Sequence, residues 1–98
     1  MEIIHKTNMQ AKCPNDGHVN KYEITIKVPS FVEVEKLLDI VKTYKETKIF
    51  QEDLTKEVAQ EIHKLFKATE SVGIIMEGIH LGFMTTTIYE YPETQYNV

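Results

Sequence analysis

The chain has 98 residues, of which 42% are hydrophobic and 27% charged, and this size and balance predict one globular domain. Eleven Lys and no Arg stand against fifteen Asp and Glu, so the net charge of −4 excludes a uniformly basic nucleic-acid clamp. A single Cys excludes an internal disulfide framework. The chain has no run of about 18 apolar residues and no signal peptide's apolar core, so we expect a cytoplasmic protein with a free thiol.

The first half of the chain predicts a strand followed by a helix. Apolar and polar residues alternate over 22–28, which is typical of a half-buried strand, and Pro29 ends it. Ser30 and Glu33 fit a capping box, and apolar residues at helical spacing then predict a helix over roughly 31–45. These apolar residues are Val34, Leu37, Leu38, Val41 and Tyr44. A short strand is possible near the N-terminus.

The second half predicts a helix followed by two strands. The helix begins near Gln51 or Asp53, and its apolar face holds Leu54, Val58, Ile62, Leu65 and Phe66. Strands are expected at 72–77 and at 85–91, where three consecutive threonines favour extended backbone. The glycines expected in the turn between these strands are Gly78 and Gly82.

Two helices between two pairs of strands predict one α+β domain over residues 1–98. We expect a four-stranded antiparallel sheet in the order ββααββ, with both helices on one face. The two open sheet edges favour pairing with further copies of the chain, and therefore a homo-oligomer. Residues 92–98 are expected to form a loosely held tail.

Cys13 lies in the polar segment 12–18 (KCPNDGH), which predicts an exposed turn before a strand. The neighbouring Lys12 and His18 are cations that favour a reactive thiolate, so Cys13 is a candidate nucleophile. The alternative is that Cys13 is a small buried hydrophobic residue. Cys13, His18 and His80 offer three possible zinc ligands, but no Cys-x-x-Cys or His-Glu-x-x-His motif is present, so we expect no metal site.

Glu52 lies in the segment 50–55 (FQEDLT), where the second helix is expected to begin. One interpretation is that its carboxylate only complements the helix dipole. The other is that it accepts two hydrogen bonds from the N–H and NH2 groups of a guanine-like edge. A buried carboxylate in that second role would contribute about 2–5 kcal/mol to binding.

Taken together, these segments resemble the tunnelling-fold superfamily of purine- and pterin-binding enzymes over most of the chain. Segment 49–55 is similar to the Gln-Glu-x-Leu-Thr stretch of GTP cyclohydrolase I, and 72–80 is similar to a strand and following histidine of that enzyme. The resemblance implies that Glu52, Gln51 and His80 bind a heterocycle. It also implies a T-fold domain that pairs its edge strands into a barrel, with active sites between subunits.

Cys13-Pro14 looks like the Cys-Pro motif of the 7-cyano-7-deazaguanine (nitrile) reductase branch. In that branch the Cys attacks the nitrile carbon to form a thioimide, and an acid seven residues later protonates the nitrogen. The corresponding residue here is Asn20, an amide that cannot supply a proton. We expect Asn20 to orient the ligand while turnover is impaired, unless Asp16 or His18 serves as the acid.

Two other family motifs are incomplete in this chain. Gly82 stands where GTP cyclohydrolase I has its second Cys, which argues against zinc-dependent cyclohydrolase activity. The NADPH motif of the nitrile reductases corresponds to 33–38, which keeps Glu33 and Leu37 but lacks both lysines. Glu33 is therefore a candidate for substrate binding rather than evidence for NADPH.

A short chain with the thioimide Cys and without the NADPH motif resembles the QueF-like archaeosine synthases. In those amidinotransferases ammonia attacks the thioimide and gives archaeosine in tRNA. The resemblance implies an enzyme without a redox cofactor whose partners are tRNA carrying 7-cyano-7-deazaguanine, ammonia and further copies of itself, most often as a decamer. Lys42, Lys45 and Lys48 would offer a local basic patch to tRNA.

Three alternatives remain open at this point. The first two are an NADPH-dependent nitrile reductase and another pterin- or purine-binding T-fold enzyme that uses Cys13 as a general acid or base. The third is a non-catalytic oligomer that binds a purine or pterin, which an amide at position 20 would favour.

Overall fold

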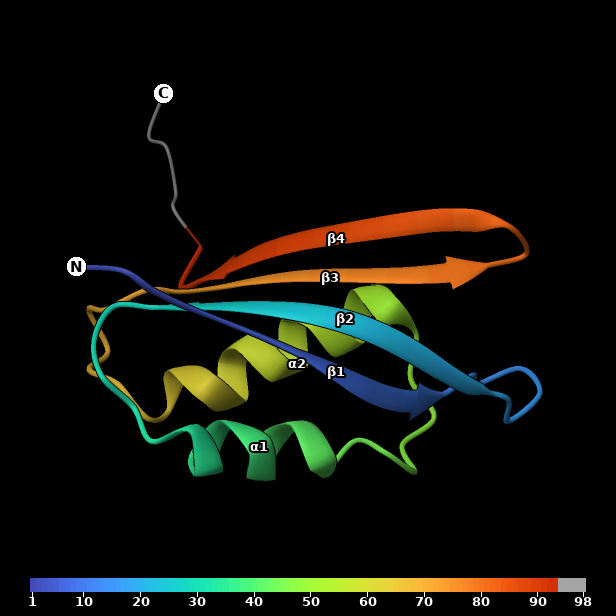
Figure 1. Cartoon of the computed structure of the whole chain (residues 1–98), viewed down its shortest axis with the longest axis horizontal. Coiled ribbons are helices and arrows are strands. Elements are labelled where there is room, and N and C mark those ends of the chain that lie inside the picture. The colour runs from blue at the N-terminus through green and yellow to red at the C-terminus, as the bar shows by residue number, and fades with distance from the viewer. Residues whose placement is uncertain (94–98) are drawn as a thin grey trace.

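A computed structural model describes residues 1–93 of the chain. Its four strands form one antiparallel sheet, and both helices lie on the same face of that sheet (Figure 1). The strand order is β1-β2-β3-β4, so each strand pairs with its neighbour in the sequence. The predicted α+β fold and its ββααββ order are confirmed. The elements are β1 (Ile3–Lys12), β2 (Val19–Val28), α1 (Val34–Lys42), α2 (Gln51–His63), β3 (Val72–His80) and β4 (Phe83–Tyr91).

The hydrophobic core lies between the sheet and the helices. The strands contribute one side of it through the period-two alternation of apolar and polar residues. Every second residue of β2 from Tyr22 onward and of β3 from Val72 to Gly78 is buried on the side that faces the helices. Helix α2 covers these residues with side chains four residues apart. The fully buried apolar residues here include Ile24, Ile26, Ile74, Met76, Leu54, Val58 and Ile62. Each side chain of this size stabilises the fold by about 1.5–3 kcal/mol through burial.

Helix α1 is shorter than the sequence predicts, and the capping box does not form. The N-cap is Glu33, in extended backbone at φ −66° and ψ 128°, and no side chain caps the helix. Burial of Val32 against the core holds the residues before the helix extended, so α1 begins only at Val34. Leu37 and Val41 are buried as expected, whereas Val34 and Leu38 are exposed.

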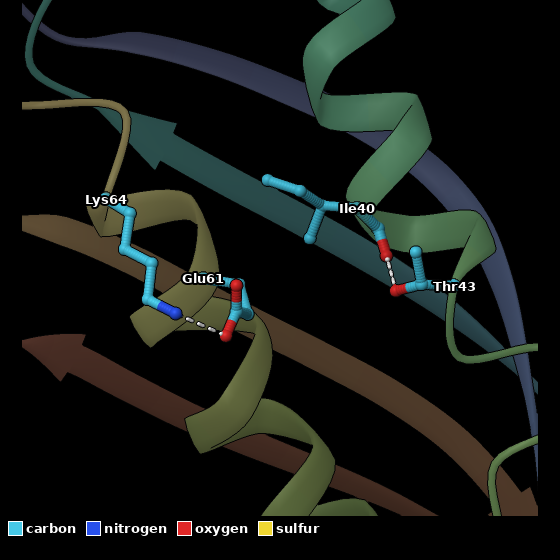
Figure 2. A network of polar contacts seen from close by, with 4 residues as sticks. All are labelled: Ile40, Thr43, Glu61 and Lys64. Carbon is cyan, nitrogen blue, oxygen red and sulfur yellow. Dashed lines mark hydrogen bonds and ion pairs between the residues drawn. The ribbon is translucent and has the colours of Figure 1, made fainter.

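The ends of both helices are tightened by local polar contacts (Figure 2). After α1, the hydroxyl of Thr43 donates a hydrogen bond to the carbonyl of Ile40 at 2.6 Å, which satisfies an acceptor that the helix end leaves open. Just after α2, the ammonium of Lys64 lies 2.8 Å from the carboxylate of Glu61. This pair is largely exposed and contributes well under about 1 kcal/mol.

The strands are longer than predicted, and this moves one glycine out of the turn. β1 has ten residues rather than a few, and β3 continues to His80, so Gly78 lies within the strand. The turn consists of Leu81 and Gly82, whose positive φ values of 50° and 83° match the twist of a two-residue hairpin. Of the predicted tail, residues 94–98 lie outside the described part of the chain. Neither helix within residues 1–93 has the length and apolar character needed to cross a membrane.

Candidate functional site

Most of the predicted site residues lie at one end of the sheet. The loop between β1 and β2, the start of α2 and the turn between β3 and β4 are all at that end (Figure 1). They carry Cys13, Glu52 and His80, and His80 is exposed beside the turn. Helix α1 begins at the opposite end, so its N-cap Glu33 is remote from the other candidates within one chain.

Cys13 is buried at the base of the β1–β2 loop, with only 7% of its surface exposed, so the expectation of an exposed thiol is wrong. The reason is the tight closure of the loop. The N–H of Cys13 donates to the carbonyl of His18 at 2.8 Å, and its carbonyl accepts from the N–H of Gly17 at 2.9 Å. Gly17 adopts a φ of 74°, which only glycine enters without strain. The loop therefore folds over the thiol.

The ammonium of Lys12 is paired with a carboxylate from the segment before α2. It forms an ion pair with Glu46, and this contact lowers the pKa of the Glu46 carboxyl. The backbone of Lys12 also donates to Thr47 at 2.8 Å and accepts from Ile49 at 3.0 Å. Lys12 thus ties the segment before α2 to the end of β1, which fixes where α2 begins relative to Cys13.

Asp16 and His18, the two alternative acids, differ in their relation to the thiol. The N–H of His18 donates to Asp16 Oδ1 at 2.9 Å, and this hydrogen bond, assisted by one from the Cys13 thiol, lowers the pKa of Asp16. Asp16 is therefore ionised at neutral pH and can accept a proton from the thiol rather than supply one. The His18 ring is 83% exposed, and its Nδ1 lies 3.8 Å from Asp16 Oδ2.

Sequence reasoning did not single out Tyr22, a buried tyrosine two residues after Asn20 on β2. Tyr22 is 6% exposed and is the register partner of Gly78 on β3. A Cβ atom at position 78 would lie 2.6 Å and 2.7 Å from two carbons of the Tyr22 ring, closer than any side chain allows. Gly78 is therefore the residue that lets the ring lie against the β3 backbone. Because Gly78 was expected in the turn and not in a strand, no signal in the sequence pointed to this contact.

Three neighbouring side chains influence the pKa of the Tyr22 hydroxyl. Burial raises the pKa of Tyr22, and the negative charges of a Cys13 thiolate and of Glu52 raise it further. A hydrogen bond with the side chain of Asn20 acts in the opposite direction. Asn20 is two residues before Tyr22 on β2 and therefore shares its face of the sheet. The pKa of this phenol therefore depends on Cys13, Asn20 and Glu52.

Gln51, a predicted ligand-binding residue, joins the start of α2 to the sheet. Its Nε2 lies 3.0 Å from the carbonyls of Met76 and Thr85 and 3.2 Å from the hydroxyl of Thr87. These three oxygens accept the hydrogen bonds that the amide group of Gln51 can donate. The other atom of the amide, Oε1, lies beside Gly78, 3.2 Å from the position that a Cβ atom on Gly78 would occupy. Gln51 can therefore offer a ligand only its acceptor oxygen.

Glu52 is exposed in the first turn of α2, beside Asp53. The expectation of a buried carboxylate is therefore wrong for a single chain. Glu52 follows Gln51 on the helix, and its side chain is directed away from the sheet that Gln51 contacts. The negative charge of Glu52 nevertheless contributes to the raised pKa of Tyr22. An exposed carboxylate forms weaker net hydrogen bonds than a buried one, because water competes for them.

The site is open in a single chain. A broad hollow is lined by Asn20, Tyr22 and Gly78, and its wall also holds Lys42 at the end of α1 and Lys45 in the segment after that helix. Its lining does not include Cys13 or Glu52. Within residues 1–93, no group of three or more His, Cys, Asp or Glu side chains is placed to hold a metal ion.

Comparisons with known proteins matched the chain by its structure, and not by its sequence. No protein-family model matches the chain, and no curated protein matches it either. Among solved structures, the archaeosine synthase QueF-like in its apo form superposes with a TM-score of 0.86. The alignment covers 96% of each chain at 15% sequence identity. The chain therefore has the fold of the QueF-like archaeosine synthase, and the predicted T-fold domain is confirmed.

Proposed function

We propose that this protein is an amidinotransferase of the archaeosine synthase type, which acts on 7-cyano-7-deazaguanine in tRNA. The observation that carries the proposal is that the β1–β2 loop with Cys13 and the start of α2 with Glu52 lie at the same end of a domain with the fold of an archaeosine synthase. A nucleophile and a carboxylate that can hold the heterocycle are groups that this chemistry needs.

The reaction has two steps and no change in oxidation state. First, the Cys13 sulfur adds to the nitrile carbon, and the nitrogen takes up one proton to form a thioimide. Ammonia then attacks the same carbon and expels the thiol, which leaves an amidine. Covalent addition helps because a nitrile is a poor electrophile, and the thioimide divides one difficult step into two easier ones.

Glu52 and Gln51 would recognise the deazaguanine ring. The Glu52 carboxylate would accept from its N–H and NH2 groups, and Gln51 Oε1, whose orientation is fixed by the three oxygens at Nε2, would accept a further N–H. His80, exposed at the same end, would line the entrance. The exposed Lys42, Lys45 and Lys48 would contact tRNA phosphates.

The proposal predicts amidine formation that depends on ammonia and not on NADPH. Purified protein incubated with ammonium and tRNA carrying 7-cyano-7-deazaguanine should yield the amidine nucleoside, measured by mass spectrometry after digestion of the tRNA. A parallel reaction with NADPH and no ammonium should yield no aminomethyl product. An aminomethyl product would indicate a nitrile reductase, and tight binding without either product would indicate a non-catalytic binding protein.

We also predict that the protein assembles, most often as a decamer. Glu33 is remote from Cys13 within one chain, and the open site leaves Glu52 exposed, so a neighbouring copy would complete it with its own Glu33. The edges of β1 and β4 carry unpaired backbone groups that favour such contacts. Light scattering at micromolar concentration should give about ten times the 11.4 kDa chain mass. A mass near that of one chain would contradict the prediction.

A further inference from the structure

Strand β4 carries three consecutive threonines at 85–87, which the sequence presents only as residues that favour extended backbone. Successive side chains of a strand point to opposite faces of the sheet, so Thr86 lies on the face opposite to the helices, whereas Thr87 faces α2. The Thr87 Oγ1 atom lies 3.2 Å from Gln51 Nε2 and 2.7 Å from Thr55 Oγ1. Thr87 therefore connects β4 to two residues in the N-terminal part of α2.

These contacts hold Gln51 by both its side chain and its main chain. Gln51 Nε2 lies 3.0 Å from the carbonyls of Met76 and Thr85, and the Thr55 hydroxyl donates to the Gln51 carbonyl at 2.7 Å. A carbonyl only accepts, so the amide must face the sheet with its two hydrogens. One arrangement uses every hydrogen of the group: both amide hydrogens go to the two carbonyls, Thr55 donates to Gln51, and Thr87 donates to Thr55.

We propose that Thr87 is a positioning residue of the candidate site. Its hydroxyl fixes the first turn of α2, so that Gln51 Oε1 and the Glu52 carboxylate stand where the N–H and NH2 groups of the ligand can reach them. The inference rests on the proposed function, because it concerns how the deazaguanine ring is recognised. Thr87 acts through Gln51 and Thr55, and so influences the ligand from the opposite side of these two residues.

The contact between Thr87 and Thr55 tolerates little change, because it is short and mostly buried. Thr55 is 1% exposed, so water does not replace a partner that its hydroxyl loses. A methyl group in place of Thr87 Oγ1 would stand 2.7 Å from Thr55 Oγ1, whereas non-bonded contacts of carbon are about 3.5 Å or longer. Thr55 and the Gln51 carbonyl that it bonds would have to move. The acceptors at the start of α2 would then meet a planar ligand at poorer hydrogen-bond geometry.

The test measures affinity for 7-deazaguanine by calorimetry, because this base has the same N–H and NH2 edge as the substrate but no nitrile to react with Cys13. Thr87→Val should weaken binding about tenfold, since the hydrogen bond that positions the acceptors is lost. Thr87→Ser keeps the hydroxyl and should bind nearly as tightly as the wild type. Thr86→Val is the matched control on the opposite face of the same strand, and its affinity should equal that of the wild type.

A second readout needs no ligand. The side-chain amide hydrogens of Gln51 are bonded to oxygens of the sheet, so their exchange with water, followed by NMR, should be slow in the wild type. Thr87→Val should speed this exchange, and Thr86→Val should leave it unchanged. A purely structural role of Thr87 would lower the Tm and leave the affinity of the folded protein as it is.

The outcomes separate this inference from the proposed function. If the wild type binds 7-deazaguanine and Thr87→Val binds it equally tightly, only the inference is wrong. If the affinities follow the expected order but the protein forms no amidine from the nitrile, the proposed function fails and the inference stands. A wild type that does not bind 7-deazaguanine contradicts both. Should Thr87→Val not fold, Thr87→Ala removes the hydroxyl without crowding Thr55, and wild-type affinity of Thr87→Ala would overturn the inference.

Discussion

Cys13→Ala should abolish the covalent adduct with 7-cyano-7-deazaguanine and all amidine formation, while the protein still binds the base. The sulfur is the atom that bonds to the nitrile carbon, and no other Cys is present in the chain to replace it. Intact mass after incubation should show the wild type heavier by the whole mass of the base and the variant unchanged. The wild-type adduct should also disappear when ammonium is added, because ammonia releases the thiol.

The burial of Cys13 makes a control necessary for this experiment. Removing a buried sulfur also removes packing, so thermal unfolding of Cys13→Ala and of Cys13→Ser should show that both variants are folded. Ligand binding measured by calorimetry should persist in both. A variant that is folded, binds the base and still gains its mass would show that another nucleophile reacts.

Glu52→Ala should weaken binding of the deazaguanine base by roughly ten- to a hundredfold, which corresponds to about 1.5–3 kcal/mol for hydrogen bonds to a charged group. This range is lower than the sequence-based expectation, because Glu52 is exposed in a single chain. The loss would reach the upper part of the range if a neighbouring copy covers the site. Calorimetry with the free base provides the measurement.

Asp53→Ala is the matched control for Glu52. Both carboxylates lie in the first turn of α2 and both are exposed, so each complements the helix dipole to a similar degree. Equal effects of the two substitutions on unfolding, with loss of affinity only for Glu52→Ala, would separate ligand binding from helix stabilisation. If both variants bind as tightly as the wild type, Glu52 serves the helix alone.

The order of elements was predictable because it depends on local periodicity. Two patterns indicate which side chains face the core: the apolar–polar alternation along β2, and the four-residue spacing of Leu54, Val58 and Ile62 along α2. Boundaries were less predictable where tertiary packing decides them. Burial of Val32 delays the start of α1, and pairing of β3 with β2 carries Gly78 into the strand. Neither contact is visible in a short window of sequence.

The residue types of the candidate site could be proposed from the sequence, and their environment could not. The Cys-Pro pair and the Gln-Glu pair pointed to Cys13, Gln51 and Glu52 as candidates, but whether each is buried depends on how the β1–β2 loop and α2 meet. Tyr22 was missed because its contact with Gly78 joins residues that are far apart in the chain. A register between distant strands cannot be read from the composition of either strand.

That register has a consequence for how the molecule folds. Both hairpins, β1–β2 and β3–β4, close over short loops, whereas the pairing of β2 with β3 spans the segment that contains both helices. Closing the longer segment has the higher entropic cost, so we expect β2 and β3 to pair later than the two hairpins. The Tyr22–Gly78 contact exists only once the hairpins have joined. A ligand bound there therefore raises the free energy of unfolding of the whole domain, and this gain grows with the logarithm of the ligand concentration. The Tm of the protein then measures how fully the site is occupied.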